Sequence, residues 1–224
     1  MRRMSAWRAL MLSTLPKRTR GYREMGFCLA ANSTNRWPKG VVPYQIDGAV
    51  FPAGSAGRQQ VLLAINAWNT TSIVKLRPTT ASDADFINIT SSSDTKACSS
   101  PLGRQGGSQQ VACIASAAAG VIMHEIGHAL GLIHEHKRPD RNSFVTINAG
   151  NVAAGRIGQF SPVDTSNCPI GAYDCGSIMH YGATSFSVDG VQPTITIVDP
   201  KVCSNIGQRN ALSAGDCRGG PGDV

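Results

Sequence analysis

Three histidines and one glutamate lie at the spacing that a catalytic metal site needs. His124 and His128 are four residues apart, so on a helix they share one face and lie about 6 Å apart along the axis. Glu125 adjoins the first of them, where its carboxylate can reach a metal-bound water rather than the metal. Gly131 can take the left-handed conformation that ends helices, so the chain can turn back and present His134. The pattern predicts one Zn²⁺ held by three neutral imidazoles, with a fourth position open for water, which is a catalytic arrangement.

The alternative is a buried helix that carries histidines only for packing. Five specified residues match this pattern by chance, in a chain of this length, with odds on the order of one in ten thousand. The pattern therefore favours the metal site.

Further motifs follow the histidines and precede them. The chain continues with Glu135–Arg141 (EHKRPDR) and later contains Ser177–Gly182 (SIMHYG). With Arg36–Tyr44, Ile206–Arg209 and Leu212–Asp216, these segments resemble the astacin family of metzincin zinc endopeptidases. The resemblance covers roughly residues 36 to 217. It implies an α+β, two-lobed fold, with a mixed sheet and the zinc helix in the N-terminal lobe and an irregular C-terminal lobe.

The resemblance also implies a role for each site residue. The implied zinc ligands are His124, His128 and His134. Glu125 would be the general base and proton shuttle, and Met179 would form an apolar floor beneath the metal. Tyr181 would be a fifth ligand that swings away and hydrogen-bonds the developing oxyanion, and Glu135 would contact the new N-terminus after activation. These roles agree with physical expectation, because zinc makes hydroxide available near neutral pH, a neighbouring carboxylate can relay its proton, and a phenol can donate to an oxyanion.

The remaining polar residues of the two motifs have less specific readings. We expect His180 to be a packed structural histidine and His136 to lie either on the surface or behind the metal ligands. Arg138, Asp140 and Arg141 are expected to form local ion pairs rather than to bind substrate.

The charge distribution argues against a nucleic-acid partner. The net charge of +7 lies in residues 1 to 36, which hold eight basic residues and one acidic residue, whereas residues 37 to 224 hold thirteen of each. The body of the protein therefore has no net attraction for phosphate. Its partners are expected to be protein or peptide substrates, with no nucleic acid and no membrane, and the chain is expected to be a monomer.

The N-terminal segment is expected to be separate from the catalytic domain. Residues 1–31 are interpreted as a basic leader or propeptide-like segment, and residues 32–224 as an astacin-like catalytic domain. Arg8 interrupts the apolar run, which leaves only residues 9–15 as the core of a signal peptide, without a small-residue cleavage site. A mis-assigned start, a propeptide remnant and a leader for another export route all remain open. No stretch is long enough to span a membrane.

Seven cysteines favour an oxidising compartment and hence a secreted protein. Six lie in the body and permit fifteen pairings. Short loops suggest Cys98–Cys113, Cys168–Cys175 and Cys203–Cys217, and the first matches a disulfide of the family just ahead of the zinc helix. Reduced cysteines in a cytosolic enzyme are the alternative.

Cys28 lies ahead of the catalytic body and has no partner among those six. A thiolate is a good zinc ligand, so one hypothesis is that Cys28 occupies the open zinc position in a latent form. The family more usually carries an aspartate in a Phe-x-Gly-Asp motif, which is absent here. An unpaired or intermolecular thiol is the alternative.

Apolar periodicity predicts the elements around these motifs. We expect an edge strand over 41–47 that tolerates Pro43, a helix capped by Ser55 and running to about Thr70 with Trp68 in the core, strands over 74–77, 86–89 and 109–113, the zinc helix over 117–130, and a short strand over 194–198. By resemblance, strand 109–113 would be the sheet edge at the upper rim of the cleft, free to pair with an extended peptide. A closing helix after Leu212 would end early at the glycines that follow residue 218.

The predicted function is a zinc-dependent endopeptidase. One alternative is a catalytically inactive zinc-containing binding module, which would need neither Glu125 nor Tyr181. Another is a zinc hydrolase that acts on a non-peptide amide or ester. The sequence does not give the substrate preference, and the activation cleavage site stays open among Arg23, Arg36 and the neighbourhood of Cys28.

Overall fold

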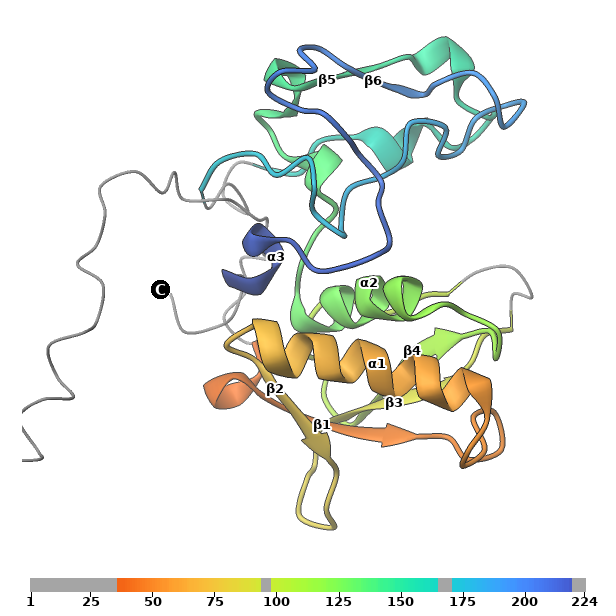
Figure 1. Cartoon of the computed structure of the whole chain (residues 1–224), viewed down its shortest axis with the longest axis vertical. Helices are drawn as coiled ribbons and strands as arrows, with labels where there is room; N and C mark the ends of the chain where they lie inside the picture. The colour runs from red at the N-terminus through yellow and green to blue at the C-terminus, as the bar shows by residue number, and fades with distance from the viewer. Residues whose placement is uncertain (1–35, 94–97, 165–170, 219–224) are drawn as a thin grey trace, which may run out of the picture.

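The computed structural model describes residues 36–93, 98–164 and 171–218. Two lobes follow one another along the chain (Figure 1). The first contains a four-stranded sheet and the two long helices, and the second contains mostly irregular chain with a two-stranded ribbon. The predicted α+β class is confirmed. The histidine motif spans the junction of the two lobes, because it begins in the last helix of the first lobe and ends at the start of the second.

The first lobe is built on a sheet of order β2-β1-β3-β4, formed by Lys75–Pro78, Val41–Ile46, Phe86–Ser91 and Ser108–Cys113. All three strand pairs are parallel. The antiparallel part of the predicted mixed sheet is an isolated bridge between Ser99 and Ala112, on the outer side of β4. Helices α1 (Ala56–Thr71) and α2 (Ala119–Leu130) pack side by side against this sheet (Figure 1).

Helix α1 forms where the sequence supplies both a cap and an apolar stripe. The Ser55 side chain accepts a hydrogen bond from the Arg58 amide at 3.1 Å, as an N-cap residue should. Val61, Ile65 and Trp68 recur at helical spacing and are buried. Trp68 is 1% exposed, and its indole N–H donates to the Met123 carbonyl at 3.1 Å. The predicted core role of Trp68 is confirmed, and it holds α1 against the helix that carries the histidines.

The prediction that strand 41–47 lies at an edge is wrong, because β1 lies between β2 and β3. The register explains how a proline is tolerated there. Pro43 is paired with Arg77 of β2, but the pairing of β1 with β3 begins only at Tyr44. Pro43 therefore has a neighbouring strand on one side only, which is the local environment that proline requires.

Strand β4 lies at the end of the sheet, as predicted for residues 109–113, but its outer side is not open at Ala112. The Ser99 amide donates to the Ala112 carbonyl and the Ala112 amide donates to the Ser99 carbonyl, both at 2.9 Å. The disulfide Cys98–Cys113 holds this segment beside β4. At Ala112, the outer side of this edge strand is therefore already paired with Ser99.

The second lobe has little regular structure. Its 3₁₀ segments are η3 (Glu135–Lys137), η4 (Arg141–Ser143), η5 (Ala149–Asn151) and η6 (Ile157–Phe160). It also contains the antiparallel pair β5 (Val145–Ile147) and β6 (Ile195–Ile197) and the short helix α3 (Ala214–Arg218). A further 3₁₀ segment, η2 (Pro38–Gly40), precedes β1 in the first lobe. A separate buried cluster of Val145, Phe160, Tyr173, Tyr181 and Ile195 forms its core. The expected irregular C-terminal lobe, its strand near residues 194–198 and its short closing helix are all present.

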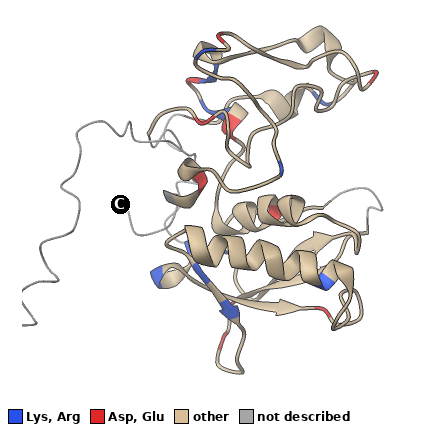
Figure 2. Ribbon diagram, viewed as in Figure 1, with Lys and Arg blue, Asp and Glu red and all other residues tan. Residues whose placement is uncertain are grey.

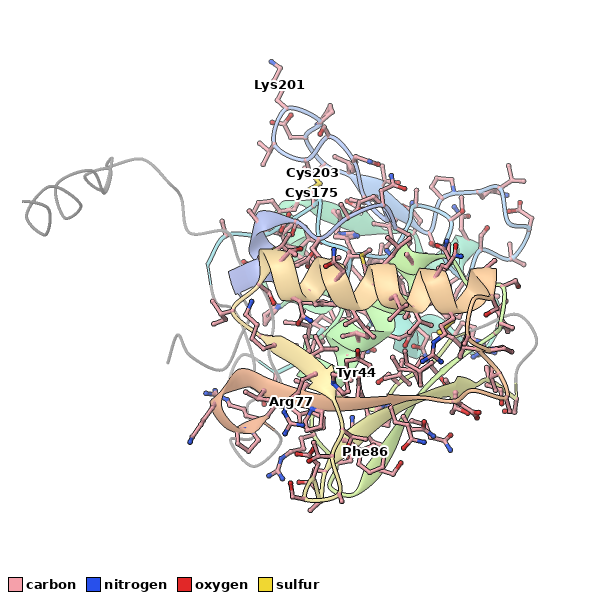
Figure 3. All side chains as sticks on the ribbon, turned by 60° about the horizontal axis from the view of Figure 1, so that its bottom comes forward. Tyr44, Arg77, Phe86, Cys175, Lys201 and Cys203 are labelled. Atoms are coloured by element: carbon pink, nitrogen blue, oxygen red, sulfur yellow. A yellow bond between two sulfur atoms is a disulfide. The ribbon has the colours of Figure 1, made fainter. Side chains whose placement is uncertain are left out.

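Two disulfides lie among the described residues, and one of them corrects the sequence analysis. Cys98–Cys113 is confirmed. Cys175 pairs with Cys203 across 28 residues (Figure 3), so the pairings Cys168–Cys175 and Cys203–Cys217 are wrong. Loop length was a poor guide because the β5–β6 ribbon folds the chain back on itself, and Cys175 packs against the same cluster as that ribbon.

The described residues carry their charges in small mixed groups. Figure 2 shows acidic and basic segments interspersed over both lobes. Within the described ranges, no helix has the length and apolar character needed to cross a membrane.

Candidate metal centre

The end of α2 turns the chain toward the metal site. Gly131 has φ 103° and closes the helix in the left-handed conformation, as predicted. Its amide donates to the His128 carbonyl at 2.9 Å, and the Leu132 amide donates to the Gly127 carbonyl at 2.9 Å. This pattern satisfies the last carbonyls of the helix while reversing the chain. His134 follows three residues later and is thereby returned to the face that carries His128.

The three imidazoles converge on one point. His134 Nε2 lies 3.2 Å from His124 Nε2 and 3.1 Å from His128 Nε2, and the ligand atoms of all three lie within 4.8 Å of one another. Tetrahedral Zn–N bonds of about 2.0–2.1 Å place ligand nitrogens roughly 3.3 Å apart. The spacing of the three nitrogens therefore fits one shared zinc ion.

Backbone carbonyls fix the orientation of two of these rings. His124 Nδ1 lies 2.7 Å from the Ile178 carbonyl, and His128 Nδ1 lies 2.8 Å from the Leu132 carbonyl. A carbonyl only accepts, so each Nδ1 must carry the proton and donate it. The Nε2 atoms then carry lone pairs that face one another at short range. Such an arrangement is unfavourable without a shared cation, and a carbonyl at Nδ1 is the second partner that metal-binding histidines usually have.

Burial keeps the imidazoles in their neutral, ligand-competent form. It lowers the pKa of His124 and of His134 well below the ordinary value, and each is lowered further by neighbouring histidines. Burial also lowers the pKa of His128. The three rings are therefore available to bind a metal without first losing a proton.

Glu125 lies beside the ligands and is 7% exposed. Burial raises the pKa of its carboxyl to about 7, while the positive charge of Arg209 opposes that rise. A carboxyl with a pKa near neutrality is suited to accept and return a proton. The charge of Arg209 also opposes the rise in the pKa of Tyr181; the sequence assigns this arginine no role at the site. It lies far beyond His134 in the chain, and no local pattern brings it to the site.

Met179 packs directly beneath the histidine helix and is 2% exposed. A Cβ placed on Gly127 would lie 2.6 Å from Met179 Sδ. Of the two residues between Glu125 and His128, the second is therefore a glycine, because only a residue without a side chain lets Met179 approach the helix this closely. This contact joins two motifs that are far apart in the sequence.

Tyr181 lies against two of the histidines. Its ring centroid is 4.4 Å from that of His134 and 4.0 Å from that of His136, with which it stacks at 25°. Tyr181 is 9% exposed, and burial raises its pKa. The tyrosine hydroxyl therefore remains a proton donor at neutral pH.

The other two histidines do not belong to the cluster of possible metal ligands among the described residues. His180 is bonded at both ring nitrogens, to the Tyr173 hydroxyl at 2.6 Å and to the Tyr181 carbonyl at 2.7 Å, so it is a packed structural residue as expected. His136 is fully buried and contacts the Gln159 carbonyl through Nε2 at 3.1 Å. Of the two alternatives for His136, the surface position is wrong.

The charged residues after His134 form a buried network. Arg138 contacts Asp140 at 2.8 Å and Glu135 at 3.4 Å. Arg141 donates to the carbonyls of His136 and Phe160. Glu135 is 1% exposed and accepts from the Asp174 amide at 2.8 Å. The local ion pair of Arg138 with Asp140 is as predicted. The proposed contact of Glu135 with a new N-terminus depends on the activation site, which the sequence leaves open, and Cys28 lies outside the described residues.

Comparisons with known proteins agree with this geometry. Residues 29–219 match the peptidase family described as Astacin. The chain is 37% identical to Protein SpAN of Strongylocentrotus purpuratus over 194 residues, and 35% identical to Zinc metalloproteinase nas-36 of Haemonchus contortus over 195 residues. Each alignment covers 82% of this chain but 30% of the relative, so the chain spans about a third of the length of these proteins.

A solved structure shows the same fold. High choriolytic enzyme 1, a hatching enzyme zinc-protease from Oryzias latipes, superposes with a TM-score of 0.69 at 34% identity, covering 81% of this chain and 88% of that one.

Proposed function

The chain belongs to the astacin family of peptidases, and we propose that it is a zinc-dependent endopeptidase that cleaves protein or peptide substrates. The single observation that carries the proposal is the convergence of three neutral imidazole nitrogens, two of them fixed by backbone carbonyls, beside a buried carboxyl. The proposed ligands of a single Zn²⁺ are His124, His128 and His134. When bound, zinc would polarise the scissile carbonyl and acidify water.

Glu125 is proposed to move the protons of the reaction. Its carboxylate takes a proton from the attacking water and later returns it to the nitrogen of the leaving amine. Burial supports this role, because it raises the pKa of Glu125 to about 7 and so makes both protonation states accessible near neutral pH. Nothing comparable is needed by a protein that only binds.

Tyr181 is proposed to stabilise the oxyanion. Its ring packs against both His134 and His136, and its hydroxyl keeps its proton because burial raises its pKa. A donor of this kind acts on charge that develops only in the transition state. The further role of Tyr181 as a fifth metal ligand belongs to the same proposal, as does that of Met179 as the floor.

Glu125→Gln tests the mechanism. The change keeps the shape of the side chain but removes its ability to accept a proton, so we expect turnover of a peptide library to fall by about 10²- to 10⁴-fold. Zinc content, measured by elemental analysis, should be unchanged. Full activity in this variant would rule out the proposed base. A wild-type protein that holds zinc yet shows no chelator-sensitive cleavage would instead favour the inactive binding module.

The segment before the catalytic domain carries two further proposals. We place the domain at residues 32–224 and treat residues 1–31 as a leader or propeptide of a secreted, monomeric protein, and the two disulfides support an oxidising compartment. Sequencing the N-terminus of secreted active material tests that boundary. Cys28 remains our candidate for a latency ligand, and unchanged latency in Cys28→Ala would exclude it.

A further inference from the structure

We propose that Asp216 is a positioning residue for the first metal ligand, His124; the inference rests on the zinc site proposed above. Asp216 lies in the closing helix α3, and its carboxylate is 2% exposed. It ends the motif Leu212–Asp216, to which the sequence assigns no role at the metal site. Its position follows from bonds that connect the closing segment (residues 206–218) to the methionine turn (Ser177–Gly182), and from there to His124.

The Asp216 carboxylate binds the methionine turn through both oxygens. Oδ1 accepts from the Ser177 hydroxyl at 2.6 Å, and Oδ2 accepts from the Ile178 amide at 2.8 Å. A buried carboxylate is costly to place unless donors surround it. The turn supplies two of these donors.

The turn transmits this constraint to His124 through one peptide unit. Ser177 Oγ accepts from the Met179 amide at 3.0 Å. That amide and the Ile178 carbonyl belong to the same planar peptide group, so fixing one fixes the other. The Ile178 carbonyl in turn accepts the His124 Nδ1 proton at 2.7 Å. Asp216 therefore sets, through Ser177 and Ile178, the direction of the carbonyl that selects the tautomer and orientation of the imidazole.

The carboxylate is itself held by a capping box at the start of α3. The Ser213 amide donates to Asp216 Oδ2 at 2.8 Å, and the Asp216 amide donates to Ser213 Oγ at 3.0 Å. This reciprocal pair is the standard way to satisfy the first amides of a helix. Ser213 Oγ also donates to Asp174 Oδ2 at 2.6 Å. The carboxylate thus has a fixed position before it reaches the methionine turn.

Asp174 supplies a matched control. Like Asp216 it is a buried carboxylate, 4% exposed, that accepts from Ser213. Its other oxygen accepts from the Gly176 amide at 3.0 Å. Among the described residues, no bond joins its carboxylate to Ser177 or Ile178. Removing it therefore disturbs the same neighbourhood without releasing the peptide that orients His124.

The test measures zinc affinity in the full chain by competition with a chelator. Partners that orient a metal-binding histidine typically contribute 10- to 100-fold to metal affinity, so Asp216→Ala should weaken zinc binding by about that factor. Asp174→Ala should leave the affinity within about threefold. Asp216→Asn keeps an oxygen for the Ile178 amide, and the Ser177 hydroxyl can rotate to accept from the new amide group, so affinity should largely return.

The outcomes separate this inference from the zinc site itself. A wild-type chain that binds no zinc would overturn both. Stoichiometric zinc in the wild type, together with unchanged affinity in a folded Asp216→Ala variant, would overturn the positioning role alone, and so would an equal loss in Asp174→Ala. Should Asp216→Ala not fold, Asp216→Glu decides, because it keeps the charge and the capping residue but displaces the oxygens from Ile178. If neither variant folds, Asp216 serves only the fold and the inference is wrong.

Discussion

Replacing Gly120 with alanine should destabilise the fold, because the added methyl group crowds the closing segment by more than the better helix propensity of alanine compensates. Gly120 lies in the first turn of α2 and is buried. A Cβ at this position would lie 1.6 Å from the Arg209 carbonyl oxygen, 2.4 Å from its carbon and 3.1 Å from its Cα. These are backbone atoms, so the clash cannot be relieved by rotating a side chain. The segment around Arg209 must move away from α2 instead.

The expected magnitude follows from three opposing contributions. Exchanging glycine for alanine in a helix stabilises by up to about 1 kcal/mol. Overpacking a filled interior costs about 1–3 kcal/mol. Displacing the segment also strains the hydrogen bond from Arg209 Nη1 to the His180 carbonyl, 3.0 Å long, which contributes about 1 kcal/mol. We therefore expect Gly120→Ala to lower the free energy of unfolding by about 2 kcal/mol.

Equilibrium urea unfolding of the zinc-loaded chain measures this change. The matched control is Gly158→Ala, because a Cβ at Gly158 meets nothing within 4 Å, and its stability should stay within about 0.5 kcal/mol of the wild type. Peptide cleavage by Gly120→Ala should also fall, since Arg209 lies in the electrostatic surroundings of Glu125. A variant as stable as the wild type would refute the close packing of α2 against the closing segment.

Four further outcomes are expected. Tyr181→Phe should lower kcat by about 10²- to 10³-fold, and unchanged kcat would remove the hydroxyl from the mechanism. Chelation should lower the free energy of unfolding by about 4 kcal/mol relative to a sample with free zinc at a thousand times Kd, which calorimetry with and without zinc can check. Replacing both Cys98 and Cys113, which are 15 residues apart, with alanine should cost about 3 kcal/mol in the same urea assay; a loss below a third of that would show that the link adds little. Burial raises the pKa of Asp174, so the folded state keeps that proton to higher pH than the unfolded chain, and this residue's contribution to stability falls as the pH rises above about 4. Asp174→Asn should remove that decline, and an identical pH profile in the variant would contradict it.

The parts of the structure that sequence predicted are those determined by neighbours along the chain. The helix cap at Ser55 and the reversal at Gly131 each depend on residues within one helical turn, and both are present. The convergence of the three histidines depends only on helix geometry and on that reversal. Cys98 and Cys113 are joined by a short connection, and their predicted pairing also matched a disulfide of the family. Local rules were sufficient for the cap, the reversal and the convergence.

The predictions that were wrong depended on which distant segments meet. Pro43 indicated an edge strand, but β1 became central because β3 joins it one residue later. Strand 109–113 is the expected sheet edge, but it is not open along its whole length, because Ser99 pairs with Ala112. Cys175 was assigned to a nearby partner, whereas Cys203 reaches it after the chain has folded back. Composition and periodicity describe each of these segments correctly but contain no information about pairing at long range.

The methionine turn can be recognised from its sequence, but the sequence does not reveal how the turn supports the metal site. The turn is bonded to the ligand segment by its backbone: the Ile178 carbonyl accepts from His124, and the Met179 carbonyl accepts from the Glu135 amide at 3.2 Å. Any residue could supply those carbonyls. The identities that the sequence records instead serve to hold the backbone in place, because Met179 fills the space left open by Gly127 and a serine at position 177 connects the turn to α3. The residue types of the motif therefore hold the turn in place. The atoms that orient the proposed ligands are backbone carbonyls, which residue types do not reveal.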